Sequence, residues 1–195
     1  MKTKNKPKFQ QIIDAAVIVI AENGYHASQV SKIAKQAGVA DGTIYLYFKN
    51  KEDILVSLFQ EKMGQFIERI EEEIKAEQNA VEKLRTLISM HYKQLAADHD
   101  LAIVTQVELR QSNKELRLKI NHVLKKYLVI VDEIIADGVK EGLFRSDLNT
   151  RLVRQMIFGT LDETVTNWVM KDQKYDLVSQ VDEVHSLIVY GLNKN

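Results

Sequence analysis

The fold is decided by residues 28–48, which read SQVSKIAKQAGVADGTIYLYF. A turn at Ala37-Gly38-Val39 separates two short helical segments, and this pattern is the sequence form of a helix-turn-helix. Ile44 and Phe48 place apolar side chains one helical turn apart on the second segment, so that segment is expected to pack on the rest of the module. Its outer face would then lie in the major groove of DNA, with its first residues at the base edges.

Helical patterns continue on both sides of this module. A first helix is predicted over Lys8–Glu22 and ends at Asn23-Gly24, a typical C-terminal signal. Ser28 is predicted to cap the second helix, and a third covers about residues 40–47. Six longer helices are predicted over about 51–76, 80–97, 100–111, 114–140, 150–171 and 176–193, with caps at Asn50, Asn79, Asn113 and Asn149.

About nine helices and no convincing strand predict an all-α fold. We expect an N-terminal three-helix domain with the helix-turn-helix at residues 1–50. A second helical domain is expected at residues 51–195. One proline, eight glycines and 45% hydrophobic residues agree with a helical globular protein.

Charge is distributed unevenly along the chain. Residues 1–51 hold eight lysines and three acidic residues, a net charge of +5, whereas the whole chain is neutral. The first quarter therefore suits a polyanion, and the remainder would repel one. The absence of cysteine suits a reducing cytoplasm. The longest apolar run, Ala15–Ala21, is too short to cross a bilayer, so we expect a cytoplasmic protein without a membrane partner.

The predicted partner of the basic module is double-stranded DNA with a palindromic operator. Hydroxyl and ammonium groups at the helix starts and flanks would hold phosphates, and the second helix would read base edges. The predicted DNA contacts are Ser28, Gln29, Lys32, Gly42, Thr43, Tyr45, Tyr47, Lys49 and Lys51.

Residues 28–48, followed by Lys51-Glu52-Asp53-Ile54-Leu55, resemble the DNA-binding domain of the TetR family of transcriptional regulators. The resemblance implies that residues 51–195 form a helical domain for ligand binding and dimerisation, with a homodimer built mainly from the last two helices. The sequence departs from the family pattern at Leu46, where many members carry a polar or aromatic residue. One phosphate contact is therefore left without a donor.

A narrower resemblance covers nearly the whole chain. Residues 12–55, 101–113 and 154–178 look like acyl-CoA-responsive regulators of fatty acid degradation from Bacillus-type bacteria. This resemblance implies a repressor of β-oxidation genes that long-chain acyl-CoA, as an effector and not a cofactor, releases from DNA. The predicted effector contacts are Phe66, Arg69, Leu87, His91, Ile103, Gln106, Val107, Arg110, Leu128 and Ile157.

The sequence carries no pattern that indicates catalysis. It lacks a phosphate-cradling glycine loop, a G-x-S-x-G motif and a cysteine nucleophile, and its five histidines have no metal-site spacing. We therefore predict no enzyme and no metal site. Two alternatives stay open: a TetR-type repressor of efflux or stress genes that senses another lipophilic ligand, and a fatty-acyl carrier that does not bind DNA.

Overall fold

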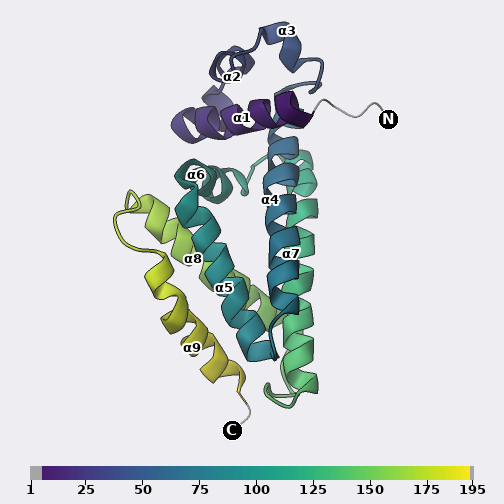
Figure 1. Cartoon of the computed structure of the whole chain (residues 1–195), viewed down its shortest axis with the longest axis vertical. Coiled ribbons are helices and arrows are strands. Elements are labelled where there is room, and N and C mark those ends of the chain that lie inside the picture. Colours follow the sequence, from purple (N-terminus) through teal and green to yellow (C-terminus); the bar gives the residue numbers. More distant parts are fainter. Residues whose placement is uncertain (1–5, 194–195) are drawn as a thin grey trace. The chain divides into compact units, whose positions relative to one another are not determined.

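A computed structural model describes residues 6–193, and residues 1–5 and 194–195 lie outside the described part. The described residues form α-helices, one short 3₁₀ helix (η1) and a single isolated β-bridge between Phe144 and Asn193, which confirms the predicted all-α class. The helices, traced in Figure 1, are α1 (Lys6–Ala27), α2 (Val30–Gln36), α3 (Asp41–Ile44), α4 (Lys51–Lys75), α5 (Ala80–Ala97), α6 (His99–Glu108), α7 (Lys114–Lys140), α8 (Thr150–Met170), η1 (Val178–Gln180) and α9 (Val181–Leu192).

The chain divides into two compact units. Unit 1 holds the described residues up to Gly64 together with Asp100–Val123, and unit 2 holds Gln65–His99 together with the described residues from Leu124 onward. Helices α4 and α7 each contribute residues to both units. The boundary predicted at residue 50 divides the sequence by motif, whereas these units divide it by compactness, so that boundary stays a prediction.

Unit 1 contains the predicted helix-turn-helix. Helices α1, α2 and α3 pack on one another (Figure 1), and Ile33, Ile44 and Phe48 are buried where they meet. Gly38 has a φ of 61°, and the Val39 amide donates to the carbonyl oxygen of Ala34 at 3.0 Å. This geometry confirms the glycine turn that the sequence predicted.

The end of the first helix differs from the prediction. Gly24 takes φ 71° and ψ 157°, so the helix breaks there as expected, but one more helical turn follows up to Ala27. Ser28 therefore does not cap α2; Gln29 occupies that position without a side-chain cap. The Ser28 hydroxyl instead donates to the carbonyl oxygens of Val19 at 3.1 Å and Gly24 at 2.7 Å, so it turns back onto the last turns of α1.

Other helix ends combine confirmed caps with shorter helices. The Asn79 side chain accepts hydrogen bonds from the amides of Val81 and Glu82, and the amides of Asp53, Leu116 and Leu152 donate to Asn50, Asn113 and Asn149. Helix α3 is shorter than predicted because the chain continues as a tighter turn from Thr43 to Leu46. Helix α6 ends at Glu108, not at residue 111, and α9 begins at Val181 after η1.

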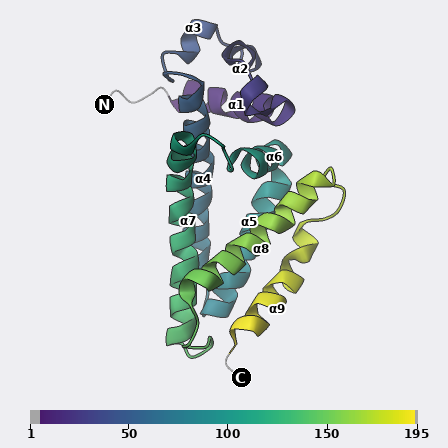
Figure 2. The ribbon, with the colours of Figure 1, turned by 180° about the vertical axis from the view of Figure 1, so that it is seen from behind.

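Unit 2 is a helical bundle in which α5 packs against both α8 and α9 (Figure 2). Leu84, Leu87 and Ile88 of α5 and Leu161 of α8 are fully buried in its core. None of the described helices carries an apolar stretch long enough to cross a membrane.

The turn after α7 depends on one glycine. The ring of Phe144 folds back over Gly138, and a Cβ atom at position 138 would lie 2.1 Å from Phe144 Cδ2. The Leu143 and Phe144 amides both donate to the Gly138 carbonyl oxygen at 2.9 Å, so the backbone cannot move away without losing these bonds.

We predict that Gly138→Ala lowers the free energy of unfolding by roughly 1–3 kcal/mol, because the new methyl group overpacks a filled site. Gly64→Ala is the matched control: it also lies inside a helix but its Cβ would meet nothing within 4 Å, so it should stabilise by roughly 0.5–1 kcal/mol. Urea unfolding at fixed protein concentration measures both. In a Phe144→Ala background, Gly138→Ala should no longer lower the free energy of unfolding. If it lowers that free energy by the same amount as in the wild type, the contact between Phe144 and position 138 is contradicted.

Candidate functional site

The predicted DNA contacts gather in unit 1, around α2 and α3. Gln29, Lys32, Gly42, Tyr45 and Lys49 are exposed, whereas Thr43 and Tyr47 are half-buried. The Lys32 ammonium donates to the side chain of Asn23 at 2.9 Å. The predicted residues therefore lie at the surface of the helix-turn-helix, with the exceptions of Ser28 and Lys51.

Ser28 and Lys51 have partners inside the protein. Ser28 is 1% exposed. The Lys51 ammonium donates to the carbonyl oxygens of Tyr25 and His26, each at 3.0 Å, and lies 4.6 Å from the centre of the Tyr25 ring. Both residues thus donate to carbonyl groups in the last turns of α1. A phosphate contact by either one stays a prediction.

Glu108, at the end of α6, completes this junction between α1 and α2. Its carboxylate accepts a hydrogen bond from the Tyr25 amide at 2.8 Å, and its other oxygen accepts one from the Gln111 side chain. Glu108 is buried. Burial, together with the charges of Glu52 and Glu108, raises the pKa of Tyr25 to about 12.

Gln106 and Arg110 were predicted as effector contacts, whereas Glu108 and its main partner were not among the residues selected from the sequence. Arg110 donates to the Gln106 carbonyl oxygen at 3.0 Å, as residues one helical turn apart can do. Tyr25 lies 83 residues from Glu108 in the chain. In the sequence, Gly24 was the residue that could have indicated this contact. A helix broken by a positive φ leaves the next amide, that of Tyr25, in need of an acceptor from elsewhere.

The predicted effector contacts fall into both units. In unit 1, Gln106 is buried, Ile103 is half-buried, and Val107 and Arg110 are exposed. In unit 2, Phe66, Leu87, His91 and Ile157 are buried, Leu128 is half-buried and Arg69 is exposed. The apolar members in unit 2 thus lie mostly inside, those in unit 1 do not, and both arginines lie at the surface.

Unit 2 brings Phe66 and His91 together around a residue that the sequence reading did not select. Tyr127 stacks on Phe66 with ring centres 6.2 Å apart, and its hydroxyl lies 3.1 Å from His91 Nδ1. Phe158 packs edge-on against the Tyr127 ring. Tyr127 lies among the apolar positions of α7. Because a buried tyrosine needs a polar partner, this position in the sequence indicated that its hydroxyl would meet a polar side chain.

His91 is held uncharged by this aromatic surrounding. Burial lowers the pKa of His91 from its ordinary value of 6.5 to about 4. His91 Nε2 forms no hydrogen bond within the described residues. The cluster is therefore neutral and largely apolar, and it favours uncharged chemical groups over ions.

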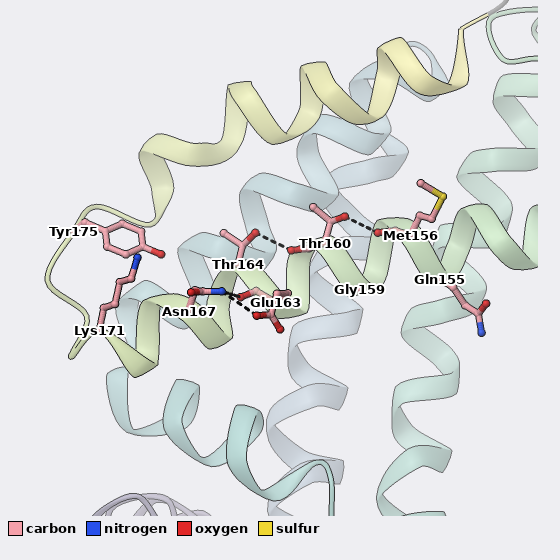
Figure 3. A pocket seen from close by; sticks show the side chains of 9 residues that line it. All are labelled: Gln155, Met156, Gly159, Thr160, Glu163, Thr164, Asn167, Lys171 and Tyr175. Carbon is pink, nitrogen blue, oxygen red and sulfur yellow. Dashed lines mark hydrogen bonds between the residues drawn. The ribbon is translucent and has the colours of Figure 1, made fainter.

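Helix α8 presents a polar groove of about 670 Å³ (Figure 3). The hydroxyls of Thr160 and Thr164 donate back to carbonyl oxygens of their own helix, each at 2.7 Å. Gly159 leaves open space above the helix. The face is thus smooth, with its hydroxyl hydrogens already used. Its lining residues are Gln155, Met156, Gly159, Thr160, Glu163, Thr164, Asn167, Lys171 and Tyr175.

A second groove, of about 480 Å³, lies between α8 and α9 and is mainly apolar. Five large apolar side chains of these two helices are more than half exposed, namely Leu152, Met156, Met170, Leu187 and Tyr190. Single exposed apolar residues are common, but a contiguous patch marks an interaction surface. Among the described residues, no three histidine, aspartate or glutamate side chains gather closely enough to hold a metal ion.

Two protein families match consecutive parts of the chain. Residues 12–58 match the family described as bacterial regulatory proteins, tetR family, and residues 59–191 match the C-terminal region of YsiA-like proteins. The chain is 68% identical over 193 residues to the fatty acid metabolism regulator protein of Bacillus subtilis (strain 168), covering 99% of each chain. It is 25% identical over 151 residues to the transcriptional repressor KstR2 of Mycobacterium tuberculosis, covering 77% of this chain and 76% of the repressor.

Solved structures show the same relationship. The FadR regulator of Bacillus subtilis in complex with stearoyl-CoA superposes with a TM-score of 0.92 at 68% identity, covering 95% of this chain and all of that one. The fatty acid degradation regulator FadR of Bacillus halodurans gives the same TM-score at 65% identity and the same coverage.

The neutral His91 leads to a prediction about pH. The pKa of His91 is depressed in the folded state, so below pH 6.5 the unfolded chain binds a proton that the folded chain rejects. Stability due to His91 is therefore present above pH 6.5 and is lost as the pH falls toward 4, by up to about 1.4 kcal/mol per pH unit.

His91→Gln keeps a neutral hydrogen-bonding side chain and removes the titration. The difference in unfolding free energy between the wild type and this variant should shrink, or change sign, as the pH falls from 6.5 to 4. Chemical unfolding at several pH values measures it. Parallel stability curves for the two proteins would contradict a buried neutral histidine.

Proposed function

This chain belongs to the TetR family of bacterial regulatory proteins, and from that premise we propose that it is a DNA-binding repressor of fatty acid degradation genes, including those of β-oxidation. Long-chain acyl-CoA is the proposed effector that releases it from its operator. The observation that carries the proposal is the 68% identity to a fatty acid metabolism regulator over 193 residues. That identity extends through the helical body and not only the DNA-binding module.

The DNA-binding part of the proposal is supported by the surface of unit 1. Tyr45 and Lys49 are exposed on and beside the second helix of the helix-turn-helix, and Gln29 and Lys32 are exposed on the first. The +5 charge of residues 1–51 adds a sequence-independent attraction to phosphates. A protein that acts on bacterial chromosomal DNA belongs in the cytoplasm, and a regulator of this family acts by binding and not by catalysis.

The effector part of the proposal rests on the related protein that was solved with stearoyl-CoA. Each buried methylene group contributes roughly 0.8 kcal/mol, so a twelve-carbon stretch supplies about 8–9 kcal/mol. Shifting a two-state equilibrium from 1:99 to 99:1 requires about 5.5 kcal/mol of differential affinity. A long acyl chain is therefore sufficient. The ten effector contacts predicted from the sequence are our candidates for its binding site.

We also propose a homodimer formed through α8 and α9. The exposed apolar residues of these helices and the smooth face of α8 (Figure 3) are suited to a second copy of the chain. Such a dimer would present two recognition helices to successive major grooves, which requires a separation of about 34–36 Å or a multiple of it. The effector would act by favouring a separation that the operator does not accept.

We predict that palmitoyl-CoA or stearoyl-CoA releases the protein from a palindromic operator selected in vitro, whereas free palmitate and CoA do not. Fluorescence anisotropy of labelled operator at moderate salt measures the release. Failure to bind any operator would reject the regulator. Operator binding that a different lipophilic compound relieves, but acyl-CoA does not, would reject the acyl-CoA assignment and favour a repressor of efflux or stress genes.

Leu187→Glu is expected to weaken the dimer, because a carboxylate on each copy would be buried in an apolar interface. Leu118→Glu is the matched control: Leu187 is 69% and Leu118 is 59% exposed, but Leu118 lies on α7. Analytical ultracentrifugation should show monomers for the first variant and an unchanged state for the second. A wild-type chain that sediments as a monomer, or equal effects of both variants, would contradict an interface at α9.

A further inference from the structure

Leu46 is an apolar side chain at the surface of the DNA-binding module. It is 79% exposed, the largest value among the exposed large hydrophobic residues of the described part of the chain. Its neighbours Tyr45 and Lys49 are exposed and polar. A leucine offers no donor to a phosphate oxygen, so Leu46 cannot make the polar contact that tyrosine or lysine makes there.

The backbone holds Leu46 on the same face as Thr43. The Leu46 amide donates to the Thr43 carbonyl oxygen at 3.2 Å, which places the two residues one tight turn apart on α3 and the turn that continues it. Ile44 and Phe48 form the opposite face and are each 1% exposed. Packing of these two side chains fixes the direction in which Leu46 projects.

The major groove offers one apolar group on its base edges, the C5-methyl group of thymine. A leucine beside a residue that reads base edges has this group as its natural partner. We propose that Leu46 reads thymine in the operator by apolar contact with the C5-methyl group. The proposal rests on the operator binding proposed above, and it assigns to Leu46 a role in sequence recognition in place of the missing phosphate contact.

The size of the contact follows from the transfer of one methyl group out of water. That transfer is worth about a fourfold change in affinity for each half-site of the operator. Because the proposed dimer engages two half-sites, the effect is squared for a palindrome. A change of this size is readily measured in a titration.

The test compares an operator selected in vitro with the same duplex in which deoxyuridine replaces every thymine. The wild type should bind the deoxyuridine duplex about fourfold more weakly than the thymine duplex for each half-site. In Leu46→Ala the ratio of the two affinities should fall toward one. Leu46→Met keeps an apolar side chain and should preserve most of the ratio. Thr43→Ser removes the methyl group of the half-buried Thr43 on the same face, and Leu118→Ala is a control for an exposed leucine on α7.

The outcomes separate the two proposals. A wild type that selects no operator rejects the DNA-binding function itself. Tight operator binding with equal thymine-to-deoxyuridine ratios for the wild type and Leu46→Ala overturns the role of Leu46 alone. If the thymine-to-deoxyuridine ratio falls to one in Thr43→Ser but not in Leu46→Ala, the methyl contact belongs to Thr43. That result would also overturn the role of Leu46.

Discussion

The hydrogen bond from the Tyr25 amide to the Glu108 carboxylate is the contact on which the arrangement of unit 1 depends. The positive φ of Gly24 breaks α1 and removes the regular helical acceptor of that amide. An acceptor must therefore come from elsewhere, and a buried carboxylate at the end of α6 supplies it. If the bond were lost, the buried Tyr25 amide would be left without an acceptor and the Glu108 carboxylate would keep only the Gln111 side chain as a donor, at a cost of about 1–3 kcal/mol.

This hydrogen bond ties the end of α6 to the junction between α1 and α2. Lys51, at the start of α4, donates to the two carbonyl groups that follow, those of Tyr25 and His26. Arg117, on α7, donates to the Gln111 carbonyl oxygen at 2.8 Å, and Gln111 in turn donates to Glu108. Residues of α4, α6 and α7 within unit 1 are thus tied by hydrogen bonds to a single junction.

The features that could be predicted from the sequence are those fixed by neighbours in the chain. The turn at Gly38 and the four asparagine caps depend on residues within a few positions, so pattern and local hydrogen bonding predicted them correctly. The cap assigned to Ser28 was wrong, because Gly24 changes which groups need partners at that point. The dimer face, the domain boundary and the individual effector contacts stay predictions.

Features missed by the sequence reading depend on residues far apart in the chain. The partner of Glu108 is 83 residues away, and Tyr127 meets His91 across 36 residues. Periodicity shows which side of a helix is apolar but not which residue of another helix it meets. Leu46 is the opposite case, since its exposure follows from the buried Ile44 and Phe48 on the other face of the same turn.

The strength of the link at Glu108 bears on which effectors can act. An effector that breaks this bond has to offset about 1–3 kcal/mol in addition to the differential affinity of about 5.5 kcal/mol needed for a full shift. At roughly 0.8 kcal/mol for each buried methylene, these terms together correspond to about eight to eleven methylene groups. For the proposed effector, a short acyl group would fall below that range and a palmitoyl or stearoyl chain would lie above it.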